Sequence, residues 1–84
     1  MPDFAKVFSR FLENSHLNNT FGEPFYKNLV YQPTHPLLRH RNQLLFKLEV
    51  LPQFCNYYGA MHGGALATVL DCATTLAIMK VKEN

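Results

Sequence analysis

The chain has 84 residues, so it holds one domain at most, and a domain of this length buries a smaller share of its surface than a full-sized one. Hydrophobic residues make up 48% of the sequence and charged residues 17%, which is a globular composition and not that of a disordered segment. The net charge of +2 is too small to indicate nucleic-acid binding. The one local basic cluster, Arg39, His40 and Arg41, is predicted to be a solvated loop, so we expect no nucleic-acid partner.

Residues 1–24 are predicted to form an N-terminal helix and a linker. Apolar residues of MPDFAKVFSRFLEN recur at helical spacing while Lys6 and Arg10 fall elsewhere, which predicts an amphipathic helix. The apolar positions are Phe4, Val7, Phe8, Phe11 and Leu12. Mitochondrial presequences have similar helices but avoid acidic residues, and this segment contains Asp3 and Glu13. We therefore expect a cytoplasmic protein, with a mitochondrial location as the alternative.

Residues 25–52 are predicted to form two strands. The segment FYKNLVYQ is predicted as the first, which ends before Pro33 and Pro36. In QLLFKLEVLP apolar residues alternate with charged ones, which is the pattern of a half-buried strand. Its inward face holds Phe46, Leu48 and Val50, its outward face holds Lys47 and Glu49, and Pro52 ends it.

Residues 56–82 are predicted to contain a turn and then a long central helix. From Gly64 the segment ALATVLDCATTLAIMK is apolar or small on nearly every face, and Lys80 and Lys82 suit a helix C-terminus. A helix of this kind is buried on all sides, so we expect the sheet to wrap around it. A membrane span is the rival interpretation. The run is short for a bilayer, and Asp71 at its centre would cost about 3 kcal/mol on insertion scales, so no span is predicted.

Two glycines, Gly63 and Gly64, follow His62 at the start of this helix. Because glycine lacks a Cβ, the pair is expected to let the backbone turn sharply and to come close to a ligand. The first N–H groups of a helix have no partner within it, and with the helix dipole they favour an anion or a polarised carbonyl. The pattern predicts an oxyanion site, and the simpler alternative is a tight turn with a histidine beside it.

The one carboxylate in the apolar helix, Asp71, lies seven residues after Gly64. This spacing puts both residues on nearly the same face, but about 10 Å apart along the axis. The carboxylate is then too far away to act on a carbonyl held at its own helix N-terminus. Two antiparallel copies of the helix across a two-fold axis would bring each aspartate to the neighbouring glycine turn. The alternative for Asp71 is a buried acid with structural hydrogen bonds, or an acid at a solvated notch of the helix.

The motif N-x-x-G-x-x-H-G-G, followed seven residues later by Asp, resembles the hotdog-fold acyl-CoA thioesterases. It is most similar to the branch of the phenylacetate-degradation thioesterases and the eukaryotic thioesterase superfamily member 2 proteins. The matching residues are Asn56, Gly59, His62, Gly63, Gly64 and Asp71. The resemblance implies an α+β hotdog fold with an N-terminal helix, two strands and a long central helix. In that family three further strands follow, so residues 1–84 are expected to form a single incomplete hotdog domain without the C-terminal strands.

The resemblance also implies catalytic roles. The family's aspartate is the general base or nucleophile toward the thioester, which points to Asp71. The backbone N–H of the glycine after the histidine polarises the thioester carbonyl, which points to Gly63. The family's asparagine places the attacking water or the substrate, which points to Asn56, while His62 is expected to brace the turn.

Two more residues are expected to contact substrate: Gly64, beside the oxyanion donor, and Tyr58, which with Tyr57 would line the substrate entrance. The implied substrate is a fatty or aryl acyl-CoA, and the implied assembly is a homodimer or tetramer with the site shared between subunits. Neither a metal nor a cofactor is required.

Other functions fit the sequence less well. A serine hydrolase lacks its G-x-S-x-G elbow. Cys55 or Cys72 with His62 would form a thiol nucleophile pair, but cysteines at such positions are more often packing residues. All three together would form a zinc site, but the short spacing between paired zinc ligands is missing. Both thiols are expected to be reduced. The main alternative is a non-catalytic hotdog fragment that pairs with a full-length homologue.

Overall fold

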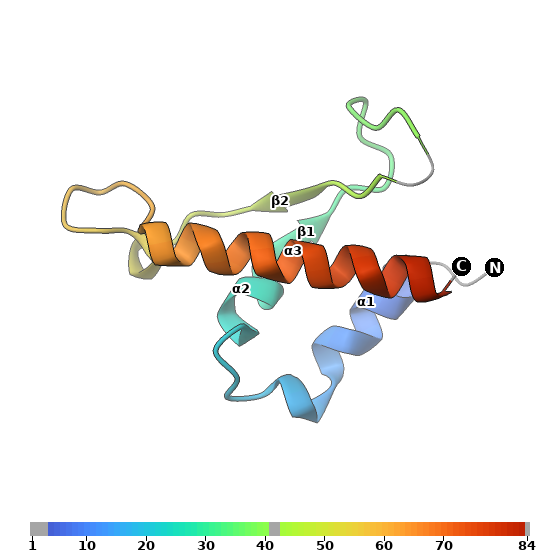
Figure 1. The fold of residues 1–84 in the computed structure, drawn as a ribbon, viewed down its shortest axis with the longest axis horizontal. Coiled ribbons are helices and arrows are strands. Elements are labelled where there is room, and N and C mark those ends of the chain that lie inside the picture. The colour runs from blue at the N-terminus through green and yellow to red at the C-terminus, as the bar shows by residue number, and fades with distance from the viewer. Residues whose placement is uncertain (1–3, 41–42, 84) are drawn as a thin grey trace.

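The computed structural model describes residues 4–40 and 43–83, so Asp3 and Arg41 lie outside the described residues. The fold is α+β, with a two-stranded antiparallel sheet and one long helix (Figure 1). The elements are α1 (Phe4–Glu13), the 3-10 turn η1 (Ser15–Leu17), α2 (Glu23–Lys27), β1 (Leu29–Tyr31), β2 (Phe46–Leu48), the 3-10 turn η2 (Pro52–Phe54) and α3 (Gly63–Glu83). The predicted order of helix, strands and long helix is confirmed, and α2 is an additional element.

The apolar face of α1 packs against the strands. Phe4 and Phe8 are buried, and each ring meets an aromatic ring of the sheet edge-on. Phe4 lies 5.2 Å from Tyr31 and Phe8 lies 5.4 Å from Phe46, measured between ring centroids. The amphipathic helix predicted for this segment is therefore confirmed.

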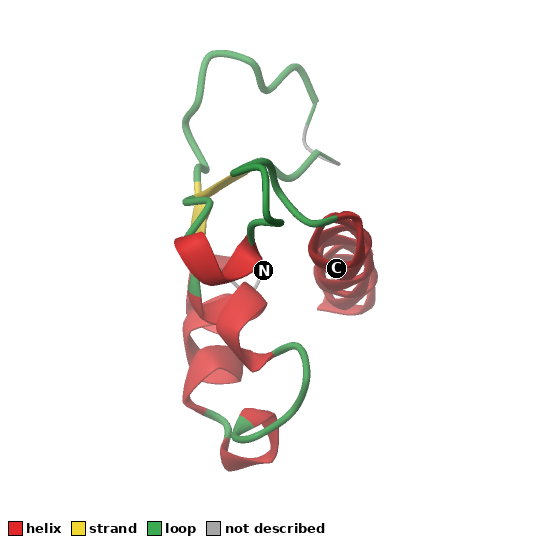
Figure 2. Ribbon diagram, turned by 90° about the vertical axis from the view of Figure 1, so that its left-hand side faces the viewer, coloured by secondary structure: helices red, strands yellow, loops and turns green. Residues whose placement is uncertain are grey.

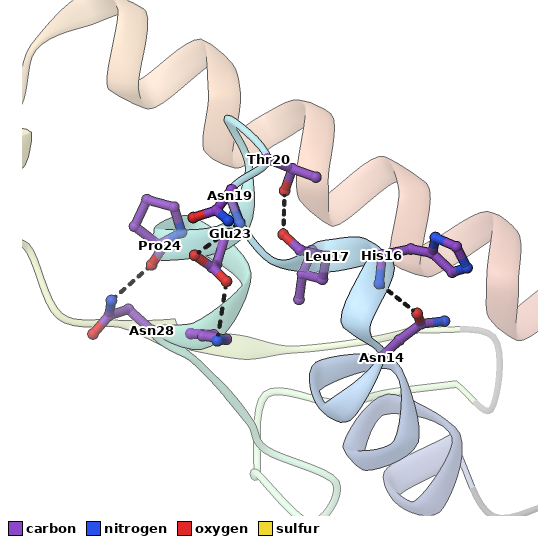
Figure 3. Close-up of polar contacts among 9 residues, drawn as sticks. Asn14, His16, Leu17, Asn19, Thr20, Glu23, Pro24 and Asn28 are labelled. Carbon is purple, nitrogen blue, oxygen red and sulfur yellow. Dashed lines mark hydrogen bonds and ion pairs between the residues drawn. The ribbon is translucent and has the colours of Figure 1, made fainter.

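Local hydrogen bonds hold the connection between α1 and α2 (Figure 3). Asn14 Oδ1 accepts a bond of 2.8 Å from the His16 N–H, which caps η1. The Thr20 hydroxyl donates to the Leu17 carbonyl oxygen at 2.7 Å. These bonds shape the segment that faces α3 across a pocket.

The predicted start of the first strand at residue 25 is wrong, because residues 25–27 belong to α2. Pro24 suits the first turn of a helix, where its missing N–H is not needed. Glu23 and Lys27, one turn apart, form an ion pair of 3.1 Å. The hydrogen bond from Lys27 is the main cause that lowers the pKa of the Glu23 carboxyl, and the hydrogen bond from the Asn19 N–H lowers it further (Figure 3). These local interactions favour a helical turn over an extended start.

The two strands pair antiparallel, with Leu29 opposite Leu48, Val30 opposite Lys47 and Tyr31 opposite Phe46. Phe46 and Leu48 are half-buried and Lys47 is exposed, which confirms the predicted alternation. Val50 was predicted on the same inward face, but it is 50% exposed. It lies beyond the strand because the chain leaves the sheet after Leu48 and turns into η2 at Pro52.

Two clusters of buried residues form the core, and α3 contributes to both. The first joins α1, β1 and α3, and the second joins α2, η2 and α3. They contain Phe4, Phe8, Leu29 and Leu76 in the first, and Phe25, Phe54 and Cys72 in the second. The rings of Phe25 and Phe54 stack at 4.7 Å between centroids. The long helix thus ties the N-terminal segment to the loop that leads into it.

The prediction that α3 is buried on all sides is wrong for this chain. In the described part of α3 only Cys72 and Leu76 are buried. Figure 2 shows α3 lying beside the other elements, with no sheet wrapped around it. The two short strands and the N-terminal helices cover one side of α3 and leave the other open. Large apolar side chains on the open side are 49% to 74% exposed: Leu66, Leu70, Ile78 and Val81.

Candidate functional site

The loop that precedes α3 is a short hairpin that projects beyond the N-terminus of the helix (Figure 1). Cys55 and Met61 form an antiparallel bridge at its base. The Gly59 N–H donates to the Asn56 carbonyl at 3.0 Å, and the Asn56 N–H donates to the Ala60 carbonyl at 2.7 Å. Gly59 has a φ of 83°, which glycine adopts without strain. The positive φ angle of the loop at position 59 thus explains why the motif has a glycine there.

Asn56 holds this loop with its side chain. Its Oδ1 accepts two bonds, from the Tyr58 N–H at 2.9 Å and from the Ala60 N–H at 3.2 Å. Among the described residues no hydrogen bond involves its Nδ2. The amide group is exposed and keeps its two N–H donors for a ligand or a partner.

Tyr58 lies at the tip of the hairpin. It is 88% exposed and Tyr57 is 96% exposed. The two rings meet edge-on at 5.4 Å between centroids. Neither ring is held by the core, so both are open to contact with a substrate or a second chain.

His62 caps the N-terminus of α3. Its Nδ1 accepts a bond of 3.0 Å from the Gly64 N–H, and its carbonyl oxygen accepts the first helical bond from Leu66 at 3.0 Å. The His62 N–H donates to the Phe54 carbonyl oxygen at 2.7 Å, which joins the cap to η2. Since Nδ1 accepts, the neutral ring carries its proton on Nε2. His62 therefore fixes the position of the helix start, in the manner of an N-cap residue.

The turn expected at the glycine pair involves no positive φ angle. Among the glycines only Gly59 has a positive φ, so Gly63 and Gly64 begin α3 with ordinary angles. A Cβ on Gly64 would lie 3.3 Å from His62 Nδ1, so this glycine makes room for the capping ring. A Cβ on Gly63 would meet nothing within 4 Å. The lack of a side chain at Gly63 is thus unexplained by any contact of the chain itself.

The backbone donors of the two glycines also differ. The Gly64 N–H donates to His62 Nδ1, so it is not free to donate to a ligand. The Gly63 N–H has no acceptor among the described residues. The Gly63 N–H is therefore free of any acceptor among the described residues, at the positive end of the α3 dipole.

Asp71 is exposed, and it lines an open pocket of about 390 Å³ between α3 and residues 11–26. About 12 Å of helix axis separate Asp71 from Gly63. The structure thus keeps the two predicted catalytic groups apart within one chain, as their spacing in the sequence predicts.

Asp71 lies on the border between two faces of α3. Successive helical residues are about 100° apart, so Thr75, Thr68 and Cys72 follow Asp71 within about 100° on one side, toward the pocket. On the other side, within about the same angle, lie the exposed residues Ile78, Ala67, Thr74 and Leu70. Asp71 therefore lies where the pocket meets the open side of the helix.

Tyr26 is a site residue that the sequence did not indicate, because the segment was predicted as a strand. Burial raises the pKa of its phenol, a hydrogen bond with Thr75 opposes this shift, and the neighbouring Cys72 and Asp71 side chains add to it. Tyr26 lines the same pocket as Asp71. Its phenol thus brings a neutral polar group to the wall beside the carboxylate.

The surroundings of the two cysteines give little support to a reactive thiol. Both cysteines are free, and burial raises the pKa of the Cys72 thiol, which disfavours the reactive thiolate. The Cys55 thiol approaches the Leu51 carbonyl oxygen at 3.6 Å. Residues 4–40 and 43–83 contain no group of three or more His, Cys, Asp or Glu side chains placed to hold a metal ion.

The helix α3 has the length and composition of a membrane span. The segment Gly63–Lys82 contains an apolar stretch of 18 residues with a mean hydropathy of 1.4. Of this stretch, 11% is buried in the structure. Length and composition are weak evidence on their own, because the core helix of a soluble protein passes the same test. The position of Asp71 near the middle of the segment opposes insertion into lipid.

Comparison of the chain with protein-family models, with curated proteins and with solved structures gives no match. The assignment of function therefore rests on the motif and on the geometry of its residues.

Proposed function

We propose that the chain is the N-terminal part of a hotdog-fold acyl-CoA thioesterase, which hydrolyses the thioester of a fatty or aryl acyl-CoA to the free acid and CoA. The observation that carries the proposal is the helix start at Gly63, whose N–H has no acceptor among the described residues and whose Cβ position is open. The exposed carboxylate of Asp71, on the same helix, supports it. Preorganised donors of this kind stabilise the negative charge that develops on a carbonyl oxygen during acyl transfer.

In the proposed reaction the thioester carbonyl oxygen accepts a hydrogen bond from the Gly63 N–H. Asp71 takes a proton from water as the water oxygen bonds to the carbonyl carbon. The carbon–sulfur bond then breaks, and the CoA thiolate leaves and takes up the proton. If Asp71 is instead the nucleophile, its oxygen bonds to the same carbon and water hydrolyses the resulting anhydride. Asn56 would hold the water or the substrate through Nδ2, and His62 would keep Gly63 in place.

The proposed site needs two chains. With about 12 Å between Gly63 and Asp71 along one helix, an antiparallel copy of α3 brings each carboxylate to the other chain's glycine. The two-fold axis then passes beside Ala67, which is midway between them. Ala67 is small and exposed, and Leu66 and Leu70 beside it supply apolar area for the contact. This assembly is a homodimer, or a tetramer built from two such dimers.

We propose that α3 is covered by protein and not by lipid, because Asp71 at mid-span would cost about 3 kcal/mol in a bilayer. The protein is then a cytoplasmic enzyme with reduced thiols, and a mitochondrial location is the alternative. It binds acyl-CoA without a metal or cofactor and has no nucleic-acid partner.

A second candidate function follows from the open side of α3. Exposed apolar side chains along a helix are typical of a surface that another chain covers. A non-catalytic fragment that pairs with a full-length homologue through this side would use the same surface without hydrolysing a thioester.

Hydrolysis of octanoyl-CoA and phenylacetyl-CoA separates the two functions. The enzyme to assay is residues 1–84 completed with the strands that follow the central helix in a hotdog domain, and thiol release is followed with a thiol reagent. The proposal predicts hydrolysis that the Asp71→Asn variant loses. Absence of hydrolysis in a folded, dimeric protein would support the non-catalytic function instead.

A further inference from the structure

A second pocket lies near the C-terminal end of α3, away from the glycine turn. The loop between β1 and β2, green in Figure 1, returns to this end of the helix, where Lys80 Nζ donates to the Gln43 carbonyl oxygen at 3.4 Å. An open pocket of about 450 Å³ lies between the loop and the helix. The lining residues used below are Tyr31, Leu38, Arg39, His40, Gln43 and Lys80.

Gln43 connects the basic residues of the loop to the helix. Its side-chain Oε1 accepts hydrogen bonds from the backbone N–H groups of Arg39 at 2.7 Å and of His40 at 3.2 Å. Its carbonyl oxygen accepts the bond from Lys80. One residue thus holds the basic part of the loop and the lysine of α3 around the same pocket.

The full charges that line this pocket have one sign. Arg39 and Lys80 are both positive, and His40 adds an imidazole with an N–H donor. No Asp or Glu of the described residues lines the pocket. Arg39 Nη1 donates to the Pro36 carbonyl oxygen at 3.1 Å, and the other four guanidinium N–H donors have no acceptor among the described residues. Two cations in one pocket repel each other, and an anion bound between them would offset this repulsion.

We propose that this pocket binds the phosphate group of a small organic phosphate monoester, at a site separate from Gly63 and Asp71. A phosphate monoester carries a charge of about −1.5 to −2 at pH 7, which matches the two positive side chains. The guanidinium group of Arg39 binds two phosphate oxygens at once, and the ammonium group of Lys80 binds as a point charge. The inference goes beyond the proposed function and does not depend on it.

The rest of the ligand is indicated by the walls of the pocket. The volume of about 450 Å³ leaves space beside a phosphate group, and the half-buried side chains of Tyr31 and Leu38 supply apolar surface there. A compact apolar substituent on the phosphate, such as an aryl group, therefore adds to binding. A polynucleotide fits less well, because its backbone needs a row of cations and the pocket supplies two in one place.

The position of Lys80 on α3 separates this pocket from the proposed thioester site. Lys80 lies 17 residues after Gly63 and nine residues after Asp71. These spacings correspond to about 25 Å and about 13 Å along the helix axis. Because CoA also carries phosphate groups, the test must distinguish a separate phosphate ligand from the nucleotide end of CoA.

Titration of the 84-residue chain with phenyl phosphate tests the inference without any turnover. At constant ionic strength, calorimetry should show one saturable site, and NMR should show shifted resonances at residues 38–40, 43 and 80. Phenol, which lacks the phosphate, should not bind. Inorganic phosphate should bind about tenfold more weakly, because it has no apolar group to bury. The nucleotide 3′,5′-ADP, which carries phosphates of CoA, should bind no more tightly than phenyl phosphate.

Two pairs of variants locate the site. Gln43→Glu keeps an oxygen that accepts the loop N–H bonds but adds a negative charge to the pocket, so it should weaken binding at least tenfold. Gln53→Glu makes the same change of net charge at an exposed position outside the pocket and should have no effect. Arg39→Ala should weaken binding about tenfold through loss of charged hydrogen bonds, and Arg10→Ala, at an exposed position of α1, should not. Circular dichroism confirms the fold of each variant.

The outcomes separate this inference from the proposed function. Equal affinities of Gln43→Glu and Gln53→Glu, or equal binding of phenol and phenyl phosphate, would overturn the phosphate site. A preference of tenfold or more for 3′,5′-ADP over phenyl phosphate would assign the pocket to the CoA substrate and overturn its separation. None of these results depends on hydrolysis by the completed protein, so each proposal can fail while the other stands.

Discussion

Replacement of Gly63 by alanine should change stability and catalysis in opposite directions. A Cβ at this position meets nothing within 4 Å and the backbone angle is ordinary, so the fold accommodates it. Alanine is favoured over glycine in helices by up to about 1 kcal/mol, less at the first position. For a domain of this size a gain of about 0.5 kcal/mol raises the Tm by about 2 to 4 °C. The chain should therefore be unchanged or slightly more stable.

Catalysis should suffer from the same methyl group. It lies beside the Gly63 N–H, and we expect it to crowd the approach of the thioester carbonyl to that donor. Loss of one such donor reduces the rate by about a hundredfold or more, close to 3 kcal/mol. The measurements are thermal unfolding of the 84-residue chain and thiol release from octanoyl-CoA by the completed protein.

The matched control is Gly64→Ala. Its Cβ would lie 3.3 Å from His62 Nδ1 and so disturbs the cap, which costs about 1 kcal/mol and offsets the gain in helix propensity. Its effect on hydrolysis should be smaller than that of Gly63→Ala, because the Gly64 N–H is already bonded. If Gly63→Ala unfolds the chain, or if it leaves hydrolysis unchanged, the assignment of Gly63 as the oxyanion donor is wrong.

Three further predictions concern the remaining residues. Asp71→Asn should keep the fold, since the side chain is exposed, and lower hydrolysis by about a hundredfold; near-normal turnover in a steady-state assay would contradict its role. Asn56→Ala should loosen the hairpin, seen as faster hydrogen exchange at the Tyr58 and Ala60 amides, with a smaller loss of rate than Asp71→Asn; the reverse order would exchange the two roles. Burial raises the pKa of Cys72 above its ordinary 9.0 in the folded chain, so the unfolded chain loses this proton first and urea-measured stability should fall as the pH rises above about 9. A Cys72→Ala variant should show a shallower fall, and an equal slope would assign the effect to other groups.

The sequence predicted the elements whose pattern is local and strong. The spacing of Phe4 and Phe8 specified α1, and the alternation of Phe46 to Leu48 specified β2. It failed at residues 25–27, where Pro24 and the ion pair between Glu23 and Lys27 favour a helical turn that an apolar pattern does not reveal. Strand pairing also decided the exposure of Val50, because β2 ends at Leu48, opposite Leu29, where the partner strand begins.

The site was predictable as a motif but not as a set of hydrogen bonds. The sequence placed Gly63 and Asp71 on one helix at a distance that excludes direct contact. It did not reveal that His62 takes the Gly64 N–H, which leaves Gly63 as the free donor. It also treated α3 as a buried helix, since composition records the apolar residues and not which neighbours are present to cover them.

The most direct test of the shared site is a mixture of two inactive variants of the completed protein. One carries Asp71→Asn and the other carries Gly63→Val, and each should be nearly inactive as a homodimer. After subunit exchange half of the dimers are heterodimers, and each has one intact site, so about a quarter of the wild-type rate should return. With exchange confirmed by mass spectrometry, failure to recover any activity would place both groups in one chain and contradict the account.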